Sequence, residues 1–595
     1  MNKTKSRNNV LINLIISFSI VLGSIVIWNI IAPFQIDNDN IYLKTISSGE
    51  MTGSPDAHMY YMGYLSGFII SLFYRITGNG IPWFGIFLCA SFAVTLFFVL
   101  FESLKKSERI QSKLSVITLF VFVYWFFFYQ FFAKTQFTIA SGLVGAGALF
   151  LLSLTDENLE LKKNYSYYAL FLILSAWSMG MRDKAFFMLI PFFGMTFISK
   201  LVSLKNKKSI KNIFAVGLSF LAVIAIVFLI NIIAYSSEDW KEFRRYTNVS
   251  EELFDYEGFP DYSTHEETYQ KMGIAQSSYE ATTRHYNIIM DKNLNADNLE
   301  SLAEIAKRER IEKEPKAIAK MLSVLKTIIK YNLFEYQDRP LNLLVFALNF
   351  FVVVLIFFSK KYKCFFDVLF ILIARMFDWI YLVWNGRFPF RVTQIIYFAE
   401  LVLLISIILK NELWKKDNDS TDSKKKNISF NVIYAIMFTG IIAISIRFGF
   451  PVMKKTYESV KAFDTMSVCF EELEEYLENH PDNFYFFDMS HLYYTEDTLA
   501  FKKSSNENYV YMGSWMPNSP WYNNKMKSWG IYDPAESLLE KDNVYILYQQ
   551  VDFDSRDFLD YYFDEHFPGT KIETVDTFES SNGFVYEVLK PKYTD

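Results

Sequence analysis

Apolar residues are gathered along the chain in long blocks that are separated by shorter polar and charged stretches. A helix of about 20 residues crosses a hydrocarbon core of roughly 30 Å, because it rises about 1.5 Å per residue. The blocks have this length, so the pattern predicts a polytopic membrane protein. We predict eleven spans, near residues 10–32, 81–101, 114–132, 139–155, 166–181, 185–203, 212–234, 341–358, 364–384, 392–409 and 429–449.

The polar connections between these blocks differ in charge. Lysine and arginine collect in the connections "MNKTKSR", "ESLKKSERIQSK", "ENLELKK", "KLVSLKNKKSIK", "SKKYK" and "KNELWKKDNDSTDSKKK". With eleven spans all of these fall on one side, which the positive-inside rule assigns to the cytoplasm. We therefore expect a cytoplasmic N-terminus and an extracytoplasmic C-terminal tail.

One apolar stretch is left out of the count. "MYYMGYLSGFIISLFYRI", residues 59–76, is apolar enough to span, but counting it would place most lysine-rich connections outside. Its tyrosine-rich start is typical of the membrane–water interface. We interpret it as an interfacial helix within an outer loop, residues 33–80.

The two longest polar segments are expected to fold outside the membrane. The loop near 235–340 is partly helical, with apolar residues at helical spacing after an Asn/Asp start in "NADNLESLAEIAKRER". In the tail, "AFDTMSVCFEELEEYLENH" indicates a helix, and "NFYFFDMS", "NVYILYQQV", "KIETVDTF" and "GFVYEVLK" indicate strands. The expected fold is mainly α: a transmembrane module, residues 1–450, and a C-terminal extracytoplasmic α/β domain, residues 451–595.

Composition supports the membrane assignment and narrows the chemistry. Of the 595 residues 52% are hydrophobic and 18% aromatic, which is more aromatic bulk than soluble proteins usually carry. The net charge of −5 gives no reason to expect a nucleic-acid partner. The three cysteines have no metal-ligand spacing, so we expect no zinc site. The Asn-, Lys- and Ile-rich usage is typical of a low-GC bacterium, whose cell membrane is the expected location.

Acidic residues and a histidine follow the first span directly. Asp37 and Asp39 lie in "DNDNIYLK", and Asp56 and His58 lie in "SPDAHMYY". An acid beside hydrocarbon is costly and needs a reason. The ordinary reasons are that these acids cap the next helix, because Asp and Asn are good N-caps, or that they mark the water boundary. The functional alternative is a cluster in which His58 orients a carboxylate or binds a phosphate.

Basic residues at the outer ends of later spans indicate an anion site. Arg182 and Lys184 lie in the turn "MRDK", and Arg387 and Arg391 lie in "NGRFPFR". Arginine holds phosphate with two parallel hydrogen bonds, and two arginines neutralise a phosphate leaving group. The turn also fits an ordinary hairpin with a local Arg182–Asp183 pair.

Two further charges lie inside a predicted span. Arg375 and Asp378 stand three residues apart, so they could pair with each other on one face of a helix. Intramembrane charges are otherwise candidates for a functional site.

These motifs together resemble the GT-C superfamily of membrane glycosyltransferases. In that superfamily the first span leads into an outer loop with an acidic motif, which "DNIYLKTISSG" matches with Asp39 at the acid position and Tyr42 after it. "GSPDAHMYYMGYLSGF" resembles the stretch that opens the interfacial helix, and "MRDKAFFMLIPFF" resembles the later basic hairpin, with Arg182 and Lys184. Two features depart from the pattern: Asn40 replaces the second acid, and "PPL" is missing before the interfacial helix.

The resemblance implies transfer of a sugar from a polyprenyl-phosphate or -diphosphate donor to an acceptor on the outer face, with inversion. Asp39 would be the base, with Asp37 or Asp56 as second candidates, and His58 and Tyr42 would support it. The basic residues named above would bind the donor phosphate. The acceptor would be a surface glycan, a teichoic-acid-like polymer or a lipid. No cofactor is certain from the resemblance, and a divalent cation, Mg²⁺ or Mn²⁺, stays open because hard cations bind carboxylate oxygens.

Three other functions remain open from the sequence. A polymerase or ligase of lipid-linked oligosaccharides would use His265, Arg284 and His285 in the 235–340 loop. A flippase would need a polar path through the spans, and few mid-span charges are visible beyond Arg375 and Asp378. A catalytically inactive assembly or wall-anchoring protein is the third alternative, which Asn40 at the usual acid position leaves open.

Overall fold

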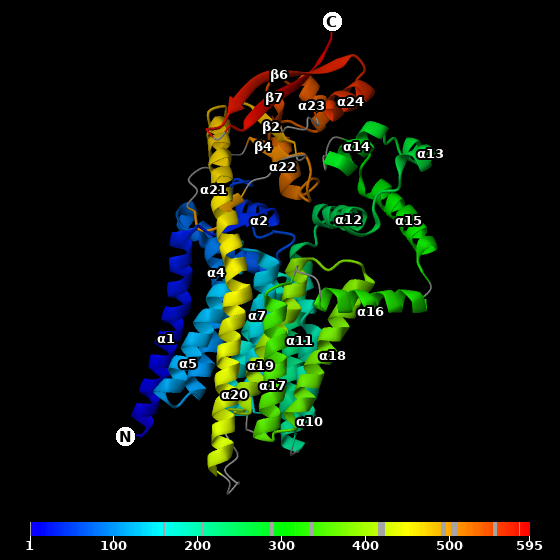
Figure 1. Cartoon of the computed structure of the whole chain (residues 1–595). Helices are drawn as coiled ribbons and strands as arrows, with labels where there is room; N and C mark the ends of the chain where they lie inside the picture. The colour runs from blue at the N-terminus through cyan, green and yellow to red at the C-terminus, as the bar shows by residue number, and fades with distance from the viewer. Residues whose placement is uncertain are drawn as a thin grey trace.

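The structure is a computed structural model, and it describes residues 2–594 except 157, 159–160, 205–206, 286–290, 316, 334–337, 415–422, 489–494, 501–507, 551–555 and 582. Long helices run side by side in a bundle, and smaller folded units stand at one end of it (Figure 1). The N-terminus lies at the opposite end of the bundle from the C-terminal sheet (Figure 1). We call these two ends the N-terminal end and the sheet end.

Nine helical stretches in the described part of the chain are long and apolar enough to cross a membrane. They comprise α1 (Asn2–Ile31), α4 (Trp83–Lys106), α5 (Ile110–Val123) with η2 (Tyr124–Phe128) and α6 (Tyr129–Ala133), α7 (Phe137–Leu154), α9 (Asp183–Phe187) with α10 (Ile190–Val202), α11 (Lys207–Ala234), α17 (Leu341–Ser359), α19 (Phe390–Lys410), and α20 (Ser423–Ile444) with η6 (Ser445–Gly449) and α21 (Phe450–Glu478). All nine coincide with predicted spans. The other two predicted spans are the helices α8 (Leu161–Met181) and α18 (Cys364–Trp384), which pack in the bundle against α7 and α11 and against α10 and α19.

Helix α7 lies at the centre of the bundle, with residues 137–152 buried. It packs against α4, α8 and α19. Its glycines permit this close packing: a Cβ on Gly142 would stand 2.4 Å from the Ile395 side chain, and one on Gly147 would stand 2.3 Å from Thr95 Oγ1. Small residues let helices in a membrane approach closely.

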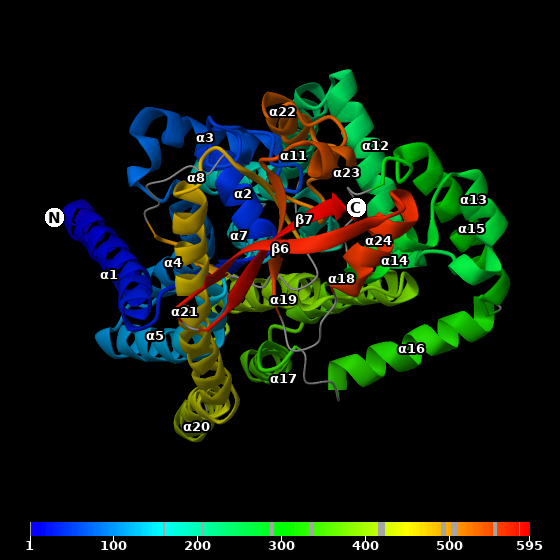
Figure 2. The ribbon, with the colours of Figure 1, turned by 90° about the horizontal axis from the view of Figure 1, so that it is seen from above.

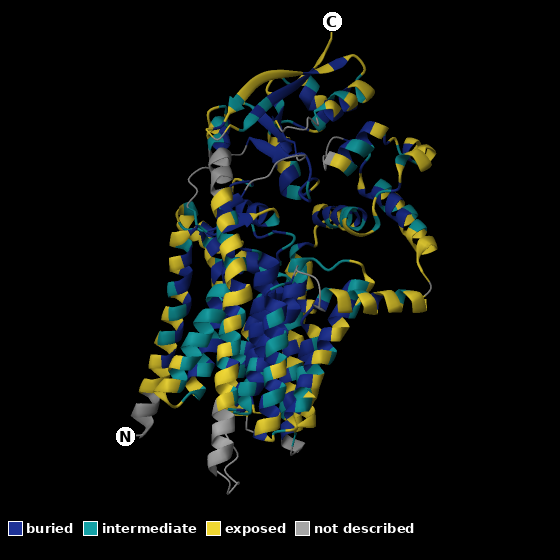
Figure 3. Cartoon of the chain, in the orientation of Figure 1, coloured by how far each residue is buried: buried dark blue, intermediate teal, exposed yellow. Residues whose placement is uncertain are grey.

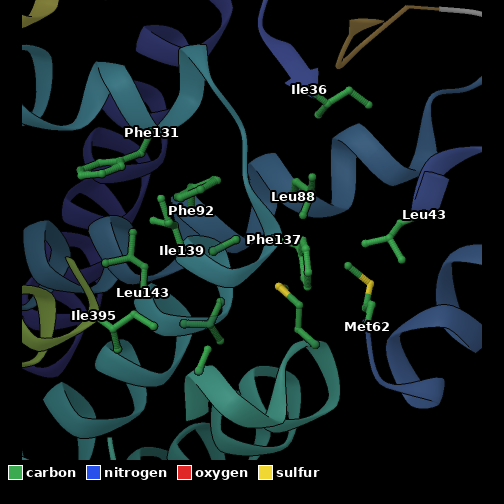
Figure 4. Close-up of a cluster of buried hydrophobic side chains, with 14 of the residues drawn as sticks. Ile36, Leu43, Met62, Leu88, Phe92, Phe131, Phe137, Ile139, Leu143 and Ile395 are labelled. Carbon is green, nitrogen blue, oxygen red and sulfur yellow. The ribbon is translucent and has the colours of Figure 1, made fainter. Parts of the chain in front are cut away.

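Burial follows the position of each helix in the bundle. Exposed residues lie along the outward faces of α1 and α20, whereas the inner helices are buried (Figure 3). Phe92, Phe137, Leu143 and Ile395 belong to the same buried apolar cluster as Leu43 of the outer loop, which lies to the right of them in this view (Figure 4). The apolar core of the bundle therefore continues into the segment that carries the predicted acids.

The outer loop after α1 forms a short strand and two helices: β1 (Gln35–Asp37), α2 (Asp39–Ser48) and α3 (Tyr64–Thr77), the last followed by the turn η1 (Gly78–Gly80). Seen along the bundle, α3 lies lengthwise across its end, as an interfacial helix would (Figure 2). The predicted start of this helix at residue 59 is wrong: α3 begins at Tyr64, with Gly63 as N-cap. The backbone turns at Asp56 instead, because the Asp56 carboxylate accepts a hydrogen bond from the His58 N–H, 2.8 Å.

The loop between α11 and α17 is helical, as predicted. It contains α12 (Glu238–Glu252), η3 (Leu253–Glu257), η4 (Tyr262–Thr264), α13 (Glu266–Lys271), α14 (Gln276–His285), α15 (Ala296–Lys313) and α16 (Ala317–Leu333). The predicted Asn/Asp start of α15 is confirmed, because the Asn295 side chain accepts from the Asn298 N–H. Residues of α12, η3 and α15 share a small apolar core of their own.

The C-terminal unit is a small mixed sheet with helices on it. Its strands lie in the order β4-β2-β5-β7-β6, with β2 parallel to β4 and β5, and β7 antiparallel to β5 and β6. The elements are β2 (Phe484–Phe487), β4 (Tyr509–Tyr511), α22 (Pro520–Ser528), α23 (Pro534–Glu540), β5 (Val544–Gln549), α24 (Asp557–His566), β6 (Thr570–Glu579) and β7 (Val585–Tyr593). The four predicted strands are confirmed, and β4 was not predicted.

The C-terminal part of the chain is joined to the outer loop by backbone pairing between two short strands. Strand β3 (Thr495–Asp497) pairs antiparallel with β1. Lys44 on α2 forms a buried ion pair with Glu496, 2.6 Å. A Cβ on Gly85 of α4 would stand 1.8 Å from the Thr498 carbonyl oxygen, so this segment also rests on the bundle. The C-terminal unit therefore covers the segment that carries Asp37 and Asp39.

Candidate functional site

Asp39 is the first residue of α2, and Asp37 is the last residue of β1. The N-cap of α2 is Asn38, whose side chain makes no capping bond and whose φ is +44°. Neither aspartate therefore caps α2, and a role in marking the water boundary stays an alternative for both. Asp39 still lies at the positive end of the helix, where a negative charge is favoured.

The Asp39 carboxylate is half-buried and accepts a hydrogen bond from Trp515 Nε1 of the C-terminal unit, 3.0 Å. Burial raises the pKa of Asp39 above its ordinary value. The positive charges of Arg391 and Arg182, together with the Trp515 bond, oppose this rise. A carboxyl with a raised pKa next to positive charges is suited to accept a proton.

Arg391 lies in the first turn of α19, and its side chain is exposed. An arginine at this position is not explained by the helix dipole, because a helix N-terminus favours negative charge. The positive end of the helix dipole and the guanidinium together form a favourable site for an anion. The charge of Arg391 acts on both Asp39 and Asp37.

Arg182 lies at the N-cap of α9 and is held in place by aromatic residues. Its Nη1 donates to the Tyr61 carbonyl oxygen, 2.7 Å, and its guanidinium lies over the Tyr61 and Phe137 rings, 4.9 and 5.5 Å from their centres. Arg182, Arg391, Asp37 and Asp39 thus converge from four elements. We call these four residues the acid–arginine cluster.

The other two predicted phosphate-binding residues have carboxylate partners. Lys184 pairs with Glu251 of α12, 2.9 Å, and its side chain is largely exposed. Arg387 pairs with Asp255 of η3 and lies over the Tyr256 ring, 5.0 Å from its centre. Both cations therefore form ion pairs with acids of the 235–340 loop and not with the acids of the acid–arginine cluster.

Asp56 and His58 also form a pair. His58 Nδ1 lies 2.8 Å from Asp56 Oδ1, and its Nε2 lies 3.2 Å from the Ala234 carbonyl oxygen at the end of α11. The imidazole stacks on Trp240, with 4.9 Å between ring centres. Burial alone would raise the pKa of Asp56, but the bonds and charge of His58 outweigh it and lower that pKa. We call the pairs Asp56–His58, Lys184–Glu251 and Arg387–Asp255 the paired charges.

Tyr42 is buried against the C-terminal unit. Its ring centre lies 4.9 Å from that of Tyr511 and 6.0 Å from that of Trp515. The Trp515 ring also contacts Tyr61, 4.9 Å between centres. Tyr42 therefore contributes to an aromatic wall beside Asp39, and burial raises the pKa of its hydroxyl, which stays protonated.

Three residues near the cluster were not among the predicted site residues. Trp515 donates to Asp39, Lys134 in the turn before α7 acts on Asp37, and Glu251 holds Lys184. Trp515 lies in the aromatic segment "YVYMGSWMPNSPWYNN", whose tryptophans and tyrosines were the available signal. Lys134 lies in the short turn "AKTQFT", and its charge was the available signal.

Asn40, which replaces the second acid of the motif, joins two elements. It is buried, its Oδ1 accepts from the Phe137 N–H at the start of α7, 3.2 Å, and its Nδ2 donates to the Asp37 carbonyl oxygen. Within the described residues no group of three His, Cys, Asp or Glu is arranged to hold a metal ion. Asp37 and Asp39 offer only two carboxylates, and Arg391 acts on both.

The intramembrane charges are arranged differently from the sequence expectation. Arg375 pairs with Glu400 of α19, 2.9 Å, and not with Asp378. Glu400 also accepts from Asn349 of α17, 2.6 Å. Glu400 was overlooked because it lies within an otherwise apolar block. The network joins α17, α18 and α19.

The predicted ligase residues lie in the helical loop, away from the acid–arginine cluster. His265 Nε2 lies 2.7 Å from Glu309 Oε1, and Arg284 pairs with Glu280 within α14, 3.8 Å. The side chain of His285 is outside the described residues.

Comparison of the chain with protein-family models, with curated proteins and with solved structures finds no match. The functional argument therefore rests on the geometry of the acid–arginine cluster. A half-buried carboxyl, two arginines from separate elements and an aromatic wall can together accept a proton and stabilise an anion.

Proposed function

We propose that the chain is a membrane glycosyltransferase of the GT-C type, which moves a sugar from a polyprenyl-phosphate or -diphosphate donor to an acceptor at the outer face of a bacterial cell membrane. The observation that supports it most is the convergence of Asp39 with Arg391 and Arg182 at one end of the apolar bundle. A lipid carrier holds its sugar at this level, where the hydrocarbon ends and water begins.

In the proposed reaction, Asp39 takes the proton from an acceptor hydroxyl as its oxygen attacks the anomeric carbon. The new carbon–oxygen bond forms on the face opposite the bond to the donor phosphate, which breaks, so the configuration inverts. General-base assistance of this kind contributes about 10²–10⁴-fold. The raised pKa of Asp39 favours it as an acceptor of this proton.

The negative charge that grows on the leaving lipid phosphate needs stabilisation. Arg391 and the first turn of α19 offer it in the proposal, with Arg182 on the other side of Asp39. Each such preorganised group is typically worth about 10²–10³-fold. The Tyr42, Tyr61 and Trp515 rings beside Asp39 would pack against the apolar face of a sugar.

The alternatives have less support. The loop residues proposed for a ligase, His265 and Arg284, pair with neighbouring glutamates. A flippase is favoured by one observation, the buried network of Arg375, Glu400 and Asn349. That network bridges neighbouring helices, and its charges are paired.

The test is surface-glycan analysis by mass spectrometry of a strain that lacks the gene. The strain is complemented with the wild type, with Asp39→Asn or with Asp183→Asn, a matched control that removes a carboxylate from the same end of the bundle. We expect one sugar to be missing, and to be restored by the wild type and by Asp183→Asn but not by Asp39→Asn. Immunoblots of membranes establish equal amounts of each protein.

Two other results would contradict the proposal. Full restoration by Asp39→Asn would remove Asp39 from the reaction. An unchanged glycan in the strain that lacks the gene would argue against glycosyl transfer altogether.

A further inference from the structure

A cavity of about 630 Å³ lies inside the bundle, between α4, α5, α17, α19 and α20. Its walls are mostly aliphatic and aromatic, and include Leu96, Val99, Leu348, Leu401 and Ile441. Along α4 it extends from Thr95 to Lys106, about 16 Å at 1.5 Å per residue. The residues of the acid–arginine cluster do not line it.

One end of this cavity is polar. Lys106, Ser107, Glu108, Arg109 and Ser112 line it where α4 ends and α5 begins, at the N-terminal end of the bundle. Two positive charges here face one negative charge, so the lining carries a net positive charge.

The first turn of α5 adds to this preference for an anion. Arg109 is its N-cap and makes no capping hydrogen bond through its side chain. The N–H groups of the first turn of a helix favour an anion, and a phosphate is a common one. The polar end thus combines two cationic side chains with the N-terminus of a helix.

We infer that the cavity binds an anionic phospholipid of the leaflet at the N-terminal end. One acyl chain occupies the apolar part, and the phosphate lies between Lys106, Arg109 and the start of α5. The volume is within the range of ligand pockets, about 300–1,000 Å³. The apolar walls and the cationic mouth match the two halves of this lipid. The phospholipid holds α5 and α20 against the inner helices at the end of the bundle opposite Asp39.

Native mass spectrometry of the full-length protein in detergent tests this inference. Phosphatidylglycerol or phosphatidylcholine with identical acyl chains is added at equal concentrations. We expect the wild type to retain phosphatidylglycerol preferentially. Lys106→Gln combined with Arg109→Gln should reduce its retention about tenfold or more, because basic residues attract anionic lipid headgroups.

Two more variants separate the headgroup from the acyl chain. Leu348→Trp places a larger ring in the apolar part and should reduce retention of both lipids. Lys162→Gln with Lys163→Gln removes two exposed charges at the same end of the bundle, outside the cavity lining, and should change nothing. Size-exclusion profiles check folding. If a double variant does not fold, Arg109→Gln alone is used, because Arg109 is exposed.

Equal retention of the two lipids by the wild type would overturn the inference, as would unchanged retention by the Lys106/Arg109 variants. Preferential retention of polyprenyl phosphate over phosphatidylglycerol would overturn the assigned occupant.

Discussion

The acid–arginine cluster and the paired charges lie at the same end of the bundle, but their charged side chains have different neighbours. Asp56 has the His58 imidazole in contact as a partner, and the pKa of Asp56 is lowered. Asp39 has one hydrogen bond, from the neutral Trp515, and its pKa is raised. A carboxylate that is already paired stabilises the fold. A partly buried carboxylate that feels positive charges without an ion pair remains available for a proton or a ligand.

The same contrast divides the predicted phosphate-binding residues. Lys184 and Arg387 each contact an acid of the helical loop, and they attach that loop to the bundle. The Arg182 guanidinium donates to the Tyr61 carbonyl oxygen and lies over the Tyr61 ring. Arg391 is exposed and has no ion pair to any described residue. The positive charges of both arginines act on Asp39, and that of Arg182 acts on Glu251 as well.

The largest effect is expected from Arg391. Arg391→Ala removes a cation that the proposal places at the leaving phosphate, and we expect sugar transfer to fall by about 10²–10³-fold. Arg387→Ala, four residues earlier, removes a cation that is paired with Asp255, and we expect a much smaller loss. The measurement is the initial rate of incorporation of the sugar in membranes with equal amounts of each protein. Equal losses in the two variants would break the division.

The next effect concerns the proton acceptor. Asp39 acts as a base only when ionised, so activity should fall as the pH is lowered through its raised pKa. Trp515→Phe keeps a ring but removes the N–H that favours the charged form. We expect the pKa of Asp39 to rise further, so the acid limb of the pH–rate profile should move to higher pH. A hydrogen bond to a charged group is worth about 1.5–3 kcal/mol, which corresponds to a shift of about 1–2 pH units.

The control for this shift is Trp521→Phe. Trp521 is a neighbour of Trp515 in the aromatic wall, and its Nε1 donates to the His58 carbonyl oxygen instead, 3.4 Å. The acid limb should stay in place in this variant. A limb that does not move in Trp515→Phe would mean that Asp39 is not the group that titrates.

A smaller effect is expected for the Asp56–His58 pair, and on stability. Asp56→Asn removes the ionised partner of His58, and we expect a loss of about 1 kcal/mol at pH 7. The pKa of Asp56 is lowered by folding, so its contribution is present above the unfolded pKa, about 3.9, and is lost as the pH falls through the lower folded pKa. Thermal unfolding in detergent should therefore separate wild type and variant at pH 7, with the difference narrowing below pH ~4. A difference that grows on acidification would contradict the pairing.

The sequence was sufficient where a strong local pattern determines the structure. The nine membrane-length helices in the described part of the chain coincide with apolar blocks, and β2, β5, β6 and β7 coincide with predicted strands. The predicted start of α3 was several residues too early. The Asp56 carboxylate accepts a hydrogen bond from the His58 N–H and forms a local turn there, and the helix begins only at Tyr64. Strands β1 and β3 are three residues each, too short to give a pattern, and they pair across more than 450 positions.

The sequence also identified only some features of the candidate site. Sequence position gave Asp37, Asp39, Arg182 and Arg391, because each lies at the end of an apolar block. It could not separate them from Lys184 and Arg387, which lie at the same ends. Only the fold brings Glu251 and Asp255 from the helical loop to these two cations, and Trp515 from the C-terminal unit to Asp39.

The smallest effect is expected for Lys184, and it sharpens the contrast within a single turn. The Lys184 side chain is 61% exposed, and exposed ion pairs contribute about 0–1 kcal/mol. Lys184→Ala should therefore change the transfer rate by no more than about threefold and stability by less than about 1 kcal/mol. Arg182→Ala, two residues earlier, should reduce the rate far more, because Arg182 acts on Asp39. A loss in Lys184→Ala as large as that in Arg182→Ala would move Lys184 into the acid–arginine cluster and identify its contact with Glu251 as a resting position.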